Sequence, residues 1–285
     1  MSVDHRGSAE MASRHRRTIS ANNGAARLQA VALGKGPTLI LLPGLGRPTS
    51  DLEPFAALLA DAGFGVVLLD TRGLGASTGP MAGITMHDLA ADVAVIAKAA
   101  GGEPVVLIGH GFGNRVARMT AADWPDLVST VVLLGASGKI PPAPEIAEAM
   151  RVVQDETTPL GQRESAARRA WFSPNGDPGP WLVGWSRPVI EACLAAVAAT
   201  PIEEWWTGGR AVILIVQGLL DVSALPENGR LLKKELGARG TLVELPGLGH
   251  ALPVENPQRV AEAVIAFLRP PRRTAEGESR AAERS

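Results

Sequence analysis

Residues 105–122 read VVLIGHGFGNRVARMTAA, and this stretch decides the fold. It begins with an apolar run at 105–108 and continues through a turn that contains Gly109, Gly111 and Gly113. Apolar residues then recur with helical spacing over residues 114–122. A short apolar run bounded by glycine is typical of a buried strand, and the spacing after the turn favours a helix. The stretch therefore predicts a buried strand that passes through a tight turn directly into a helix.

Similar units recur on both sides of this stretch. Other apolar runs, rich in Val, Ile and Leu, lie at 38–42, 66–69, 131–134, 212–216 and 242–245. Helical patterns lie between the runs, at 52–61, 87–99, 226–236 and 257–268. Alternating strands and helices predict an α/β fold with a mostly parallel, doubly wound sheet and helices on both faces. Residues 27–33 predict an earlier strand, antiparallel and at the edge of the sheet.

The composition is that of a globular protein and excludes several function classes. The 285 residues are 46% hydrophobic and 20% charged, with a net charge of −1, so no nucleic-acid partner is expected. No apolar run is long enough to span a membrane, and no secretory signal is visible, so we expect a cytoplasmic protein without membrane contact. The single cysteine, Cys193, fits a reducing compartment. No dinucleotide fingerprint and no His/Cys cluster is present, so we expect no cofactor and no metal.

The pattern divides the chain into a core, an insertion and two tails. Residues 1–24 and 270–285 are polar and predict disordered tails, the first of them basic. Residues 25–138 and 208–269 carry the strand–helix alternation, whereas 139–207 show no clear strand and predict a helical cap inserted between two strands. Most of the tryptophans fall in this cap: Trp171, Trp181, Trp185, Trp205 and Trp206. They either form the cap's own small core or line an apolar cleft, and Trp171, Trp181 and Trp205 are the candidate substrate contacts.

Three sequence motifs with candidate catalytic residues follow predicted strands. The sequence Gly-His-Gly-Phe-Gly has the form Gly-x-nucleophile-x-Gly of a nucleophile elbow, with Gly111 at the nucleophile position. Asp221 follows the run at 212–216, and His250 follows the run at 242–245. Because sites in parallel sheets form at the carboxyl ends of the strands, we expect these residues to meet at one edge. Backbone N–H groups from the loop after residue 42 and from Phe112 could face an oxyanion there.

These motifs together resemble the α/β-hydrolase family, in its capped subgroup. The resemblance covers about residues 25 to 269 and rests on LLPGLG, DTRGLGAST, GHGFGNRVA, QGLLDVSALPEN and PGLGHALPVENP. It implies a cap at 139–207, with Asp221 and His250 as the acid and base of a triad. It also implies that the N–H groups of Leu45 and Phe112 form the oxyanion hole. We expect a small-molecule substrate as the partner, and the sequence leaves the oligomeric state open.

The chain departs from the family at the nucleophile itself. Covalent catalysis needs a hydroxyl, thiol or carboxylate, and Gly111 offers none. Glycine accepts the strained backbone of an elbow more easily than other residues do, so its presence there can stabilise the fold. Ser137, just beyond the run at 131–134, is a candidate for a displaced nucleophile, although its position also suits an ordinary turn.

Two functions are compatible with this combination. In the first, His250, oriented by Asp221, acts as a general base without a nucleophile. It either activates water for direct hydrolysis or removes a proton from the substrate, as a lyase or a cofactor-free oxygenase requires. In the second, the protein is an inactive relative that binds a small apolar or aromatic ligand. The intact acid–base pair favours the enzyme.

Overall fold

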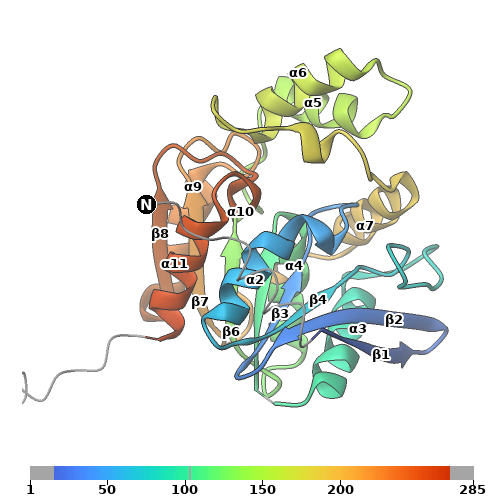
Figure 1. The fold of residues 1–285 in the computed structure, drawn as a ribbon, viewed down its shortest axis with the longest axis vertical. Helices are drawn as coiled ribbons and strands as arrows, with labels where there is room; N and C mark the ends of the chain where they lie inside the picture. Colours follow the sequence, from blue (N-terminus) through green and yellow to red (C-terminus); the bar gives the residue numbers. More distant parts are fainter. Residues whose placement is uncertain (1–15, 103, 270–285) are drawn as a thin grey trace, which may run out of the picture.

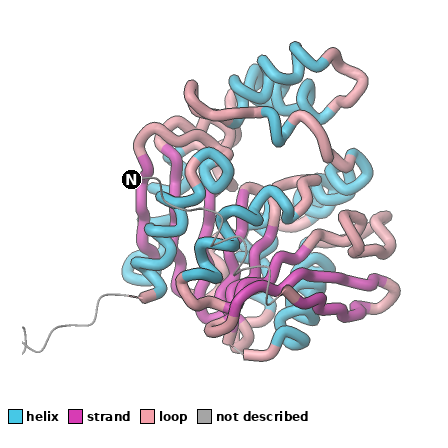
Figure 2. The backbone as a smooth tube through the Cα atoms, viewed as in Figure 1, coloured by secondary structure: helices cyan, strands magenta, loops and turns pink. Residues whose placement is uncertain are grey.

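The structure, a computed structural model, describes residues 16–102 and 104–269. Its centre is one sheet, which Figures 1 and 2 show as strands lying side by side between helices. The strands are β1 (Arg17–Asn23), β2 (Ala26–Gly34), β3 (Thr38–Leu42), β4 (Gly65–Leu69), β5 (Val105–His110), β6 (Val128–Leu134), β7 (Val212–Gly218) and β8 (Gly240–Leu245). Their order is β1-β2-β4-β3-β5-β6-β7-β8, and all neighbours from β4 to β8 are parallel. The predicted doubly wound, mostly parallel sheet is confirmed.

Helices cover both faces of the sheet, as the alternation predicts. One face carries α2 (Glu53–Asp61), α10 (Leu252–Glu255) and α11 (Pro257–Leu268), together with η1 (Thr49–Leu52). The other face carries α3 (Met86–Ala100), α4 (Phe112–Asp123) and α9 (Pro226–Leu236), and a short η3 (Gly237–Arg239) follows α9. The two faces have separate apolar clusters, because side chains of successive strand residues point to opposite sides.

The first strand corrects two expectations. Residues 17–23, assigned above to a tail, form β1, which pairs with β2 from Arg17↔Ala32 to Asn23↔Ala26. The strand predicted at 27–33 is β2, antiparallel as expected, but it lies between β1 and β4 rather than at the edge. β1 has a weak apolar signal because it is an edge strand whose only buried side chain is Ile19. The expected tails at residues 1–15 and 270–285 lie outside the described residues.

Between β6 and β7 the chain forms the helices α5 (Pro144–Gln154), α6 (Leu160–Trp171), η2 (Gly179–Trp181), α7 (Arg187–Ala199) and α8 (Ile202–Trp205). Figure 1 shows α5 and α6 as a layer apart from the sheet, whereas α7 lies closer to the core. The packing follows this division. The first half has its own small apolar cluster, which includes Trp171 and Trp181. The second half adds Cys193, Trp205 and Trp206 to the main core. The boundary of the cap at 139–207 stays a prediction.

None of the described helices is both long and apolar enough to cross a membrane.

Candidate active site

The elbow between β5 and α4 needs glycine at its two outer positions. A Cβ on Gly109 would overlap the backbone of Gly113, and a Cβ on Gly113 would overlap the carbonyl oxygen of Leu42. Strand, turn and helix are therefore pressed together too closely for side chains at these positions. The tight turn aims the central residue, Gly111, at the carboxyl edge of the sheet.

Gly111 itself has room for a side chain. A Cβ there would lie 3.1 Å from Nε2 of His250, a tight but non-overlapping contact with a side chain. The backbone of Gly111 has φ 52° and ψ −110°, in the left-handed half of conformational space. Such dihedrals cost roughly 1–3 kcal/mol for a residue with a Cβ. The geometry thus points any side chain at position 111 toward the imidazole.

The acid–base pair predicted from the sequence is assembled in the fold. Nδ1–H of His250 donates to Oδ2 of Asp221 over 2.8 Å. The other oxygen of Asp221 accepts from the backbone N–H groups of Ser223 (2.9 Å) and Ala224 (2.7 Å). The Asp221 carboxylate is completely buried and His250 is nearly so. With Nδ1 committed to the carboxylate, the lone pair on Nε2 of His250 faces the elbow and is free to accept a proton.

His110, next to Gly111, contacts the backbone of His250 and so helps to position the His250–Asp221 pair. Its Nε2–H donates to the carbonyl oxygen of His250 over 2.9 Å, so its remaining nitrogen carries no proton. Burial, followed by the nearby His250 ring, lowers the pKa of His110 to about 3. His110 therefore stays neutral at physiological pH and positions His250 rather than competing with it as a base.

The buried His110 is expected to make the protein acid-sensitive. Between its ordinary pKa of 6.5 and its folded value of about 3, the unfolded chain binds a proton that the folded chain does not. Stability is then lost as the pH falls below 6.5, by at most about 1.4 kcal/mol per pH unit. Urea unfolding at pH 7, 5.5 and 4.5 should show a smaller loss in His110→Gln than in the wild type. Equal losses in both proteins would contradict this role.

The backbone donors expected for an oxyanion lie around the same point. Leu45 follows β3 in the turn that the Arg47 N–H closes on Gly44 O (3.1 Å), and Phe112 opens α4. Both line the pocket that contains Gly111 and His250. Within residues 16–102 and 104–269, no chain oxygen accepts from the N–H of Leu45 or Phe112. The N–H of Phe112 at the start of α4 is suited to hold a negative oxygen, and the N–H of Leu45 in the turn after β3 can serve as the second donor.

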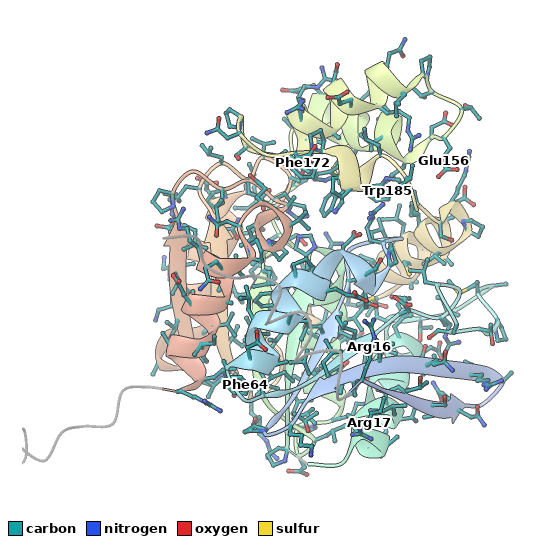
Figure 3. The ribbon with its side chains drawn as sticks, in the orientation of Figure 1. Arg16, Arg17, Phe64, Glu156, Phe172 and Trp185 are labelled. Carbon is teal, nitrogen blue, oxygen red and sulfur yellow. The ribbon has the colours of Figure 1, made fainter. Side chains whose placement is uncertain are left out.

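An apolar pocket of about 150 Å³ opens above these groups. Two of the predicted substrate contacts, Trp171 and Trp181, line it, and so does Trp185, which the sequence analysis did not select. Trp171 and Trp185 stack with centroids 5.0 Å apart, and Figure 3 shows Trp185 on the side of the α5–α6 layer that faces the core. A cavity of this size holds a ligand of about one ring, because an apolar void of roughly 150 Å³ accommodates benzene.

Trp205, also selected as a substrate contact, is not among the residues that line this pocket. It is 2% exposed and packs with Trp206 in the main core, behind Arg115, whose Cζ lies 5.7 Å from its ring centroid. The cation of Arg118 lies 4.7 Å from the same ring. Sequence composition could not separate it from Trp171, because all these tryptophans fall in one helical stretch.

Two arginines line the pocket and were missed by the sequence analysis. Arg47 donates to both oxygens of Asp51 and to the carbonyl oxygens of Val183 and Pro180, and so ties the loop after β3 to the roof of the pocket. Arg115, in the first turn of α4, donates through Nε to Oγ of Ser137 over 3.2 Å. The sequence did contain a signal for each: Arg47 follows the loop after β3, and Arg115 lies at the start of the helix that follows the elbow.

Ser137 also lines the pocket, so it stays a candidate for a displaced nucleophile. Its hydroxyl is paired with Arg115, whereas Nε2 of His250 faces Gly111. No group of three or more His, Cys, Asp or Glu side chains suited to a metal occurs in the described part of the chain.

Comparison with known proteins gives this arrangement a family context. A family model described as alpha/beta hydrolase fold matches residues 37–155. A hydrolase from Pseudomonas aeruginosa has a similar crystal structure, with a TM-score of 0.72 and 25% identity over 89% of this chain and 98% of that one. The protein has the α/β-hydrolase fold. The fold that the sequence motifs implied is thereby confirmed.

Two curated relatives with hydrolase names match this chain at moderate similarity. A 2-(acetamidomethylene)succinate hydrolase from Mesorhizobium japonicum is 31% identical over 126 residues, 44% of this chain and 45% of that protein. A bifunctional esterase/perhydrolase from Acinetobacter calcoaceticus is 24% identical over 270 residues, 82% of this chain and 92% of that protein. The chain thus spans less than half the length of the first of these relatives.

Proposed function

We propose that the protein is a hydrolase in which His250, held by Asp221, activates water directly against a small apolar or aromatic ester or amide. The observation that carries the proposal is the intact base, because Nδ1 of His250 is fixed to a buried carboxylate and Nε2 faces the elbow. The hydrolases among the relatives support the reaction class. They say nothing of a missing nucleophile.

The geometry suits a single attack by water. A Cβ on Gly111 would lie 3.1 Å from Nε2 of His250, and an oxygen atom at that point would be within hydrogen-bonding distance of the imidazole. As the water oxygen bonds to the carbonyl carbon, its proton passes to Nε2, and Asp221 stabilises the resulting imidazolium. The negative charge on the carbonyl oxygen is held by the N–H groups of Leu45 and Phe112. Collapse breaks the bond to the leaving group, which receives the proton from His250.

The same base could instead remove a proton from an acidic C–H or O–H of the substrate, as a lyase or cofactor-free oxygenase does. The oxyanion donors favour hydrolysis, because they serve a charge that develops on a carbonyl oxygen.

A second candidate function follows from Gly111. The missing nucleophile is the residue that ordinary esterase chemistry needs, so the protein could bind a small ligand in the pocket without turnover.

The wild type is expected to hydrolyse aryl esters without a covalent intermediate. With 4-nitrophenyl acetate it should release 4-nitrophenolate without a burst, show no added mass after rapid quenching and resist fluorophosphonate probes, because Gly111 cannot be acylated. Ser137→Ala is the matched control and should behave like the wild type. Labelling that disappears in Ser137→Ala would identify a displaced nucleophile instead. No turnover above the buffer rate with any ester in a panel would favour the binding protein.

A further inference from the structure

The pocket contains a guanidinium group that the chain itself does not neutralise. Arg115 lines the same cavity as Gly111 and His250, and its only hydrogen bond among the described residues goes to the neutral hydroxyl of Ser137. No described aspartate or glutamate forms an ion pair with it, and no acidic side chain occurs among the described residues that line the pocket. Arg115 is half-buried, and its terminal NH₂ groups are not enclosed by protein, so they are open to the cavity and to a partner that enters it.

Two neighbouring arginines have acceptors for their guanidinium groups within the chain, in contrast to Arg115. Arg47 forms an ion pair with both oxygens of Asp51 and donates to two backbone carbonyls. Arg118 is fully buried and donates to the backbone oxygens of Asn114, Trp206 and Ser137 and to the side chain of Asn114. These two arginines are fixed by their contacts. Arg115 instead keeps both of its terminal NH₂ groups without a described acceptor.

The ring of Trp205, whose centroid lies 5.7 Å from Cζ of Arg115, is a favourable neighbour for this cation, but the helix around it is not. Arg115 lies in the first turn of α4, where the helix start carries partial positive charge and where no acidic residue is present. Arg118 follows at the i+3 position, so two like charges share one side of the helix. Burial lowers the pKa of Arg115, which agrees with a cation that lacks a counter-ion. An anion in the pocket would offset the repulsion from the helix start and from Arg118 and the loss of hydration of the guanidinium.

We propose that the pocket selects a small substrate that carries a carboxylate, which Arg115 binds while the apolar part of the molecule packs against Trp171 and Trp185. The guanidinium fork matches the two oxygens of a carboxylate. The size of the pocket limits the rest of the ligand to about one ring. This inference rests on the proposed function for the site, since it names the substrate class, but its test uses binding and requires no turnover.

Phenylacetate and 2-phenylacetamide make a matched pair of probes, because they share the ring and differ in charge. Isothermal titration calorimetry with the wild type should show phenylacetate binding about ten- to a hundredfold more tightly, as expected for hydrogen bonds to a charged group. Arg115→Gln should remove this preference and leave the affinity for the amide unchanged. Arg115→Lys should keep part of the preference, because it retains the charge and loses the fork.

The control is Arg187→Gln, which removes an exposed arginine of α7 paired with Glu191 and should leave both affinities unchanged. Without ligand, Arg115→Gln should unfold at or above the wild-type Tm, because an uncompensated cation is lost. Equal affinity for the two probes, or no measurable binding of either, would overturn the proposal, and so would a clear drop in Tm for Arg115→Gln. Carboxylate-selective binding without any ester turnover would contradict the hydrolase proposal and leave this one standing.

Discussion

The Gly111→Ser variant is expected to hydrolyse small activated esters through an acyl-enzyme that the wild type cannot form. The new Cβ would lie 3.1 Å from Nε2 of His250, so the hydroxyl is attached directly beside the base. The N–H groups of Leu45 and Phe112 stand in the same pocket. A burst of 4-nitrophenolate close to the enzyme concentration and stoichiometric labelling by a fluorophosphonate probe should both appear.

Gly111→Ala is the matched control for this variant, because it adds the same Cβ without the hydroxyl. Both variants should lose roughly 1–3 kcal/mol of unfolding free energy, since each places a Cβ on a left-handed backbone and moves His250 by a few tenths of an ångström. Denaturant midpoints measure this loss separately from the kinetics. A folded Gly111→Ser variant with neither burst nor label would show that the pair and the elbow are not arranged for catalysis, and would favour the binding function.

The His250→Ala variant is expected to lose nearly all activity of the wild type, by a factor of about 10² or more, because general-base catalysis commonly contributes that much. Asp221→Asn should be comparably severe. It leaves the shape of the site in place, but the imidazole loses the carboxylate that fixes Nδ1–H and stabilises its protonated form. Initial rates with the best ester of the panel, measured with the Gln258→Ala surface variant as control, test both changes. Wild-type rates in either variant would exclude the proposed mechanism.

The central strands of the sheet could be predicted because they are buried on both faces. The runs at 38–42 and 212–216 are apolar without interruption, and they became β3 and the body of β7. β1 was missed for the opposite reason. Of its residues 17–23 only Ile19 is buried, and the strand is joined to the sheet by backbone pairing with β2, which leaves little trace in the side chains.

The site was predictable where chemistry coincides with the end of a strand. Asp221 and His250 follow β7 and β8, so the topology alone brings them to one edge. Residues of the predicted cap had no such signal. Trp205 in α8 and Trp185 in the loop before α7 both fall in that stretch, yet the first packs into the core and the second lines the pocket. The lack of an acidic partner for Arg115 depends on which described side chains the fold brings near it, and no local sequence pattern encodes that.

The contacts of Arg47 connect the turn that contains Leu45 with the tryptophan-lined side of the pocket. Its backbone N–H closes the turn that holds Leu45, while its side chain grips the carbonyl oxygens of Pro180 and Val183 beside Trp181. The tryptophan-lined roof of the pocket and an oxyanion donor are thus connected through one residue. We therefore expect a displacement of one to be transmitted to the other, so that the shape of the pocket and the position of the donor are set together.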